Sequence, residues 1–131
     1  VFDDAYHRLK AADFTVIVHV ILGFPWESED DMLATIRYLS ALEPTLDGIK
    51  LQLLHVLRGT KLGRMYEAEP FRTLTLDEYC TLVVQCLRLL PPDTVIHRIT
   101  GDGPKRLLLA PLWSADKKKV LNALNHAIYE A

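Results

Sequence analysis

Residues 14–22 (FTVIVHVIL) form an almost uninterrupted apolar run that ends at Gly23-Phe24-Pro25. A short run this rich in β-branched residues predicts a strand, and its apolar character predicts burial on both faces, as in parallel sheets. Glycine lets a backbone approach another group closely, and proline fixes the direction in which the chain leaves the strand. The segment therefore predicts a buried strand that ends either in an ordinary turn or at a ligand.

Predicted helices alternate with strands along the rest of the chain. Strands that are separated by helices form parallel sheets through right-handed crossovers. The sequence therefore predicts an α/β fold of about three parallel strands covered by helices, in a single domain of residues 1–131, with at least one bare sheet edge. We expect helices at residues 3–12 and 61–67, and three more helices that begin after a cap at Ser28, at a capping box of Thr75–Glu78, and after Ser114 or Asp116. Further strands are expected at residues 48–56 and 94–99.

Composition excludes several classes of protein. Half of the residues are hydrophobic and 24% are charged, which supports a folded core. The net charge of -2 provides no overall basic field for nucleic acid. No apolar run approaches the roughly 20 residues that cross a bilayer. We expect a cytoplasmic protein without a membrane segment, and the initial valine suggests a piece cut from a longer chain.

The two cysteines lie on the apolar face of one predicted helix. Cys80 and Cys86 are six positions apart, whereas paired metal ligands are usually two to four apart or lie in loops. We therefore assign both side chains to the core and predict no metal ligand in this chain.

Polar side chains interrupt the predicted strands. They fall at alternating positions, so that one face of the sheet is predicted to be polar: His19, Lys50, Gln52 and Arg98. Such a face indicates a ligand site, although buried polar residues that are satisfied within a core would give the same pattern. Asp102 lies between two glycines and would either orient Arg98 or a ligand hydroxyl, or simply occupy a turn.

Three segments carry a resemblance to a known family: HVILGFPWES, IKLQLLHVLRGTKLGRMYE and HRITGDGPKRLLLAPLWSADKKKVLNAL. Together they resemble the carboxyl-terminal half of the core barrel of radical S-adenosylmethionine (radical SAM) enzymes, most closely a bacterial branch of uncharacterised proteins described as Fe-S oxidoreductases. The resemblance covers essentially the whole chain. Two positions depart from the family pattern, because Trp26 replaces a usual glycine and Gln52 stands where this branch more often has histidine.

The resemblance implies the later half of a partial (β/α)6 TIM-like barrel. In this family a [4Fe-4S] cluster, held by a C-x3-C-x2-C loop, and S-adenosylmethionine generate a 5'-deoxyadenosyl radical. This sequence lacks the cysteine loop. We therefore expect the cofactors to belong to a full-length parent, the missing amino-terminal half to be the partner, and this chain alone to bind no cofactor and to be inactive.

The resemblance also assigns site residues position by position. One group would lie beside the adenine or present backbone to its edge: Ile21, Gly23, Phe24, Pro25, Leu53, Leu54 and His55. A second group would face the substrate: His19, Lys50, Gln52, Arg98 and Asp102.

Alternatives and further expectations remain. The chain could be a stand-alone α/β module that binds a nucleotide or a protein, or an RNA-contacting portion of a tRNA-modifying enzyme, in which Lys117–Lys119 would contact phosphate instead of forming a solvated face. Without its upstream neighbour, the strand at 14–22 would expose an edge, leave its inner face with Ile17 and Ile21 uncovered, and promote a homodimer. The segment 105–113 (KRLLLAPLW) is apolar enough to cover that edge instead.

Overall fold

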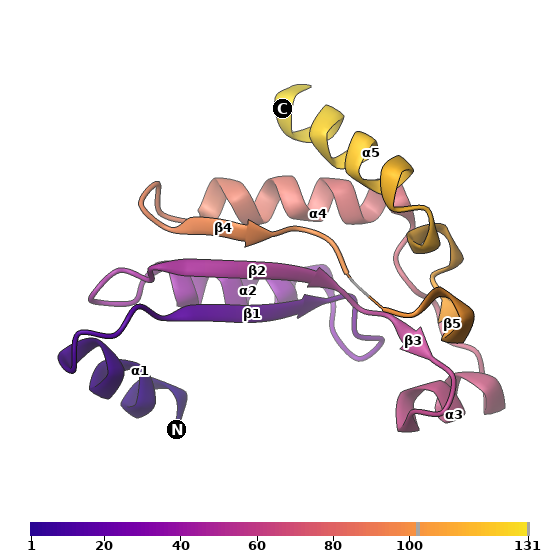
Figure 1. Ribbon diagram of the computed structural model, residues 1–131, viewed down its shortest axis with the longest axis horizontal. Helices are drawn as coiled ribbons and strands as arrows, with labels where there is room; N and C mark the ends of the chain where they lie inside the picture. Colours follow the sequence, from indigo (N-terminus) through magenta and orange to yellow (C-terminus); the bar gives the residue numbers. More distant parts are fainter. Residues whose placement is uncertain (102, 131) are drawn as a thin grey trace.

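A computed structural model describes residues 1–101 and 103–130, so Asp102 lies outside the described residues (Figure 1). The elements, in chain order, are α1 (Phe2–Ala11), β1 (Ile17–Leu22), α2 (Glu29–Ser40), β2 (Gly48–Leu53), β3 (Val56–Leu57), α3 (Lys61–Ala68), α4 (Leu76–Leu89), β4 (Val95–Arg98), the 3-10 helix η1 (Lys105–Leu107), β5 (Leu108–Ala110), the 3-10 helix η2 (Leu112–Ala115) and α5 (Lys117–Glu130).

A parallel sheet with the strand order β1-β2-β4 forms the centre of the fold. Helices α2 and α4 lie on the same face of this sheet, behind the strands in Figure 1. Val20, Leu22 and Leu51 belong to the buried core together with residues of these two helices. The predicted three parallel strands and α/β class are therefore confirmed.

The apolar run alone predicted a first strand buried on both faces, and this is wrong for the isolated chain, whereas the uncovered inner face expected without the upstream half agrees with the structure. Ile17 and Ile21 are 38% and 41% exposed, whereas Leu22 is fully buried. The difference arises because α2 and α4 pack against the same face, and the opposite face of the described sheet stays open.

Local capping signals set the starts of the long helices. Ser28 and Thr75 each form a capping box, with Asp31 and Glu78 respectively. The last helix is capped by Asp116, whose Oδ1 accepts the Lys119 N–H at 3.1 Å. Of the two positions considered for the start of this helix, Ser114 is excluded because it lies in η2.

The predicted strand 48–56 is two strands in two different sheets. β2 ends at Leu53, and β3 pairs antiparallel with β5 in a second, two-stranded sheet. A small second core of Leu54, Val56 and Ala110 joins these strands to the loop after β1. Segment 105–113 therefore pairs with β3, and the expectation that it covers the β1 edge is wrong.

Helix α1 is fixed where the chain enters β1. Lys10 Nζ lies 2.7 Å from Asp47 Oδ2, and the same oxygen accepts the Val16 N–H at 2.8 Å. The hydrogen bond from Lys10 holds the pKa of the Asp47 carboxyl below its usual value. Tyr6 is buried, and its hydroxyl donates to the Pro44 carbonyl at 2.6 Å. These contacts set the position of β1 relative to β2.

Candidate functional site at the strand ends and the open face

The carboxyl ends of β1 and β2 meet at Gly23. The Leu54 N–H donates to the Leu22 carbonyl at 2.8 Å, which extends the pairing of the two strands by one residue. Gly23 has φ of +109°, a conformation that residues with side chains rarely adopt. A Cβ there would lie 3.3 Å from Leu74 Cδ1 and 3.6 Å from Leu54 Cβ. Substituting Gly23 would therefore disturb backbone and packing as well as any ligand contact.

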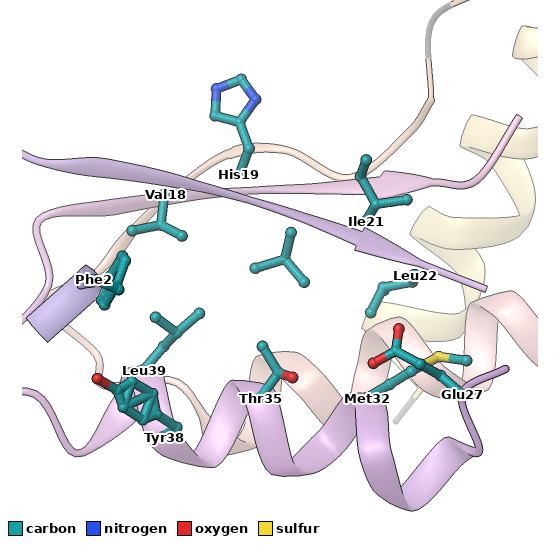
Figure 2. A pocket seen from close by; sticks show the side chains of 11 residues that line it. Phe2, Val18, His19, Ile21, Leu22, Glu27, Met32, Thr35, Tyr38 and Leu39 are labelled. Carbon is teal, nitrogen blue, oxygen red and sulfur yellow. The ribbon is translucent and has the colours of Figure 1, made fainter. Parts of the chain in front are cut away.

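The other predicted adenine-side residues differ in what they can offer a ligand. The side chains of Leu53 and Leu54 are only 5% and 7% exposed, so these residues can contact a ligand mainly through backbone. Ile21 projects from the open face of β1, away from α2 (Figure 2). Pro25 is exposed, and Phe24 is half-buried with its ring stacked on Trp26 at a centroid distance of 4.8 Å. The end of β1 thus presents an apolar and aromatic surface.

His55 packs beneath the loop that follows β4. A Cβ on Gly101 would lie 2.6 Å from its Nε2, and one on Gly103 would lie 2.8 Å from its Nδ1. The two glycines therefore leave the space that the imidazole occupies. This contact couples the end of β2 to the loop after β4.

Strand register places three predicted substrate-side residues, His19, Lys50 and Gln52, on the open face, and it pairs Arg98 with Lys50 across a register shift. His19 pairs with Lys50, and Lys50 pairs with Arg98 on its other side. Gln52 pairs with Ile21 one level nearer the strand ends. Side chains of residues that pair across regular parallel strands point to the same face. The open face therefore carries polar side chains halfway along the strands, at His19 and Lys50.

His97 is a residue of this face that the sequence did not single out as a site residue. The register of β2 and β4 shifts between Ile49 and Lys50, next to His97. A Cβ on Gly48 would lie 2.7 Å from His97 Nε2, so the imidazole occupies the space above that glycine. Gly48 at the start of this strand was the available signal, since a strand glycine often marks such a close approach.

The cysteines have no place in this site. Both cysteines belong to α4 and lie on its buried side, where Cys80 is 6% exposed and Cys86 is fully buried. Burial raises the pKa of both thiols, that of Cys86 to about 11. Residues 1–101 and 103–130 contain no group of three His, Cys, Asp or Glu side chains arranged to hold a metal ion. These two cysteines do not fit a cluster, whose ligands are thiolates.

We expect both thiols of the folded 131-residue chain to react slowly with an aromatic disulfide reagent. Raising the pKa of Cys86 from 9.0 to about 11 lowers its thiolate fraction about 100-fold at neutral pH, and burial restricts access further. The same raised pKa means that the folded state favours the neutral Cys86 thiol. The stabilisation that the folded state gains from this neutral thiol is therefore complete below pH 9.0, and it is lost as the pH rises towards about 11.

Absorbance of the released reagent gives the rate, with the denatured chain as the control for full reactivity. Anaerobic incubation with iron and sulfide should likewise give no stoichiometric cluster. Rapid labelling of the folded chain, or a cluster that disappears in Cys80→Ser or Cys86→Ser, would contradict the assignment of these residues to the core.

Parallel strands with helices on one face and an open polar face on the other match the arrangement in the wall of a β/α barrel. Residues 46–130 match the family described as Radical_SAM C-terminal domain. The chain therefore belongs to the radical SAM family and forms the later part of its core barrel.

Among the described residues, no helix is long and apolar enough to span a membrane.

Similar proteins agree with this family. The chain is 38% identical over 122 residues to the uncharacterized protein YtqA of Bacillus subtilis, covering 93% of the chain and 37% of YtqA. It is 28% identical over 106 residues to Elongator complex protein 3 of Mus musculus, covering 80% of the chain and 19% of that protein. The chain thus spans little more than a third of YtqA and about a fifth of the Elongator protein.

A solved structure shows the same fold. The archaeal Methanocaldococcus infernus Elp3 with an amino-terminal deletion superposes with a TM-score of 0.70, covering 85% of this chain and 28% of that chain. The sequence identity is 19%, so this likeness concerns the fold alone.

Proposed function

We propose that this chain is the later half of the barrel of a radical SAM enzyme, and that an upstream half of the same protein completes the barrel. The observation that carries the proposal is the edge of β1, which pairs with no other strand among residues 1–101 and 103–130, beside a polar open face; a complete barrel would cover both. Membership of the family and the small share of YtqA that the chain spans support this function over an independent binding module.

A groove lined by residues of β1 and α2 lies beside the free edge of β1. Its volume is about 330 Å³. Figure 2 shows Val18 and Leu22 pointing from β1 towards the α2 residues, whereas His19 points to the opposite side of the strand. An upstream strand paired with β1 would bury this groove and extend the open face into an enclosed interior. In the isolated chain we propose that a second copy pairs with the same edge.

The residues at the strand ends fit S-adenosylmethionine. Ile21, Phe24 and Pro25 offer the apolar contact that a purine ring needs, and the Leu54 carbonyl and the His55 backbone offer hydrogen-bonding groups for its edge, since the Leu54 N–H is already donated to the Leu22 carbonyl. Together with a reduced [4Fe-4S] cluster, S-adenosylmethionine supplies a 5'-deoxyadenosyl radical for hydrogen abstraction. We assign the cluster to a C-x3-C-x2-C loop in the upstream half, and to this chain the roles of orienting the ligands and excluding water.

Cofactor cleavage in the full-length parent tests this function. The anaerobically reconstituted parent is mixed with S-adenosylmethionine and dithionite, and 5'-deoxyadenosine is quantified by chromatography. We expect product from the parent and none from a variant with alanine at the three cysteines of the upstream loop. A parent that has no such loop, or that carries a cluster yet forms no 5'-deoxyadenosine, would refute the proposal.

Contact with RNA is a second candidate function, supported by the similarity to Elongator complex protein 3 and by three adjacent exposed lysines, Lys117–Lys119, at the start of α5. If these lysines contact phosphates, a Lys117→Gln, Lys118→Gln, Lys119→Gln variant of the parent should bind tRNA more weakly and with a shallower salt dependence. Equal affinity and an equal salt slope in gel-shift titrations would exclude the lysines from an RNA interface.

A further inference from the structure

We propose that His19, Lys50 and Arg98, which we name the cationic row, bind a phosphate or carboxylate group of a molecule other than S-adenosylmethionine. The inference rests on the proposed function, because the open face becomes the interior of a binding chamber only when an upstream half closes the barrel. It identifies the substrate of that chamber as an anion.

The cationic row is a single level of the sheet. Lys50 in β2 pairs with His19 in β1 on one side and, just after the register shift, with Arg98 in β4 on the other. Neighbouring strands lie about 4.8 Å apart, so the three Cα atoms span roughly 10 Å. The lysine and arginine side chains are long enough to converge on one anion from adjacent strands, and guanidinium groups bind phosphate and carboxylate in a bidentate manner.

No carboxylate from these strands balances the row. β1, β2 and β4 contain no acidic residue. The three ion pairs found among residues 1–101 and 103–130 are Arg8–Asp4, Lys10–Asp47 and Arg72–Glu78, so none involves the cationic row. Two cations side by side on a sheet cost stability unless an anion lies between them. Lys50 is also half-buried, which increases that cost.

The residues on either side of the cationic row, along the strand direction, indicate how deep in the chamber a ligand would lie. Below it, towards the amino ends of the strands, Ile17, Gly48 and Val95 form an apolar level with the His97 ring above Gly48. Gly23, where we place the cofactor, is four residues beyond His19, or roughly 13 Å along the strand. An anion on the cationic row therefore lies well inside the chamber, and this depth favours a second molecule over the cofactor.

Titration of the full-length parent with inorganic phosphate tests the inference. The parent is saturated with S-adenosylmethionine, and phosphate binding is measured by calorimetry at constant ionic strength. We expect Lys50→Gln and Arg98→Gln each to weaken phosphate binding by roughly tenfold or more, because each removes a charge-assisted hydrogen bond. Arg98→Lys, which keeps the charge, should retain more of the affinity than Arg98→Gln. The matched control Lys105→Gln, an exposed cation in η1, should leave the affinity unchanged.

Three results would overturn the inference. The first is a folded parent that binds S-adenosylmethionine but no phosphate, and the second is equal phosphate affinity in all variants. The third is a loss of S-adenosylmethionine affinity in Lys50→Gln and Arg98→Gln with unchanged affinity for decarboxylated S-adenosylmethionine, which would assign the row to the cofactor's own carboxylate. Phosphate binding by a parent that forms no 5'-deoxyadenosine would instead uphold the anion site and refute the radical chemistry.

Discussion

The isolated 131-residue chain is expected to form dimers at tens of micromolar (~10–100 µM, where weak protein dimers form), and Ile17→Lys or Ile21→Lys to convert them to monomers. β1 is the edge strand of the described sheet, with backbone groups along one side that pair with no other strand of that sheet. Ile17 and Ile21 project from its open face with 38% and 41% of their surface exposed. Two copies that pair their β1 edges across a two-fold axis would bury both isoleucines.

Light scattering on the purified chain measures this association. Leu121→Lys is the matched control, because it places the same charge at an exposed position of α5, 43% accessible and distant from β1 in the fold. We expect the control to remain dimeric and both isoleucine variants to keep their helical circular dichroism. A clean monomer of the unaltered chain, or dimers that persist in Ile17→Lys and Ile21→Lys, would show that the β1 edge does not mediate association.

Gly101→Ala is expected to reduce the free energy of unfolding by about 2–3 kcal/mol, the cost of forcing an extra methyl group into a packed site. The new Cβ would lie 2.6 Å from His55 Nε2 and 2.9 Å from the Leu53 carbonyl oxygen. The imidazole fills the space beside Gly101, and the carbonyl belongs to the end of β2. The substitution should therefore displace His55 as well as lower stability.

A double-mutant cycle with His55→Ala separates these two contacts. Removing the imidazole should make Gly101→Ala less costly in the His55→Ala background, with a coupling of roughly 1 kcal/mol or more measured by urea denaturation. Gly59→Ala is the glycine control, because a Cβ there meets nothing within 4 Å, although its φ of +87° still imposes a smaller backbone cost. Equal and additive effects of Gly101→Ala in both backgrounds would exclude the packing of His55 against this loop.

Much of the fold could be predicted because its signals are local. Helix starts depend on residues a few positions apart, so the sequence predicted the Ser28 cap and the capping box at Thr75–Glu78, and both are confirmed. Alternation along each strand likewise predicted that Lys50 and Gln52 share a face. The family resemblance supplied the barrel, which the alternation of helices and strands could not distinguish from an open sheet.

The remaining features depend on contacts between distant segments. The division of residues 48–56 into β2 and β3 follows from the pairing of β3 with β5, more than fifty residues later. The order of residues across the cationic row depends on strand register, including the shift next to His97. Both are properties of packing, so neither alternation nor composition could predict them. The apolar run alone predicted burial of the open face of β1, because an apolar strand gives the same signal whether or not the chain supplies a second layer; only the family resemblance predicted that Ile17 and Ile21 would be uncovered.

Backbone hydrogen exchange in the full-length parent, with and without S-adenosylmethionine, tests the central claim that these strand ends face the cofactor in a barrel completed by the upstream half. We predict slower exchange on cofactor addition in peptides covering residues 21–26 and 53–58, with α5 unchanged as the internal control. In the parent without cofactor, the β1 amides should already be protected by an upstream strand. If the cofactor binds and protects only upstream peptides, or if β1 exchanges freely in the parent, the assignment of this chain to the cofactor-facing barrel wall is wrong.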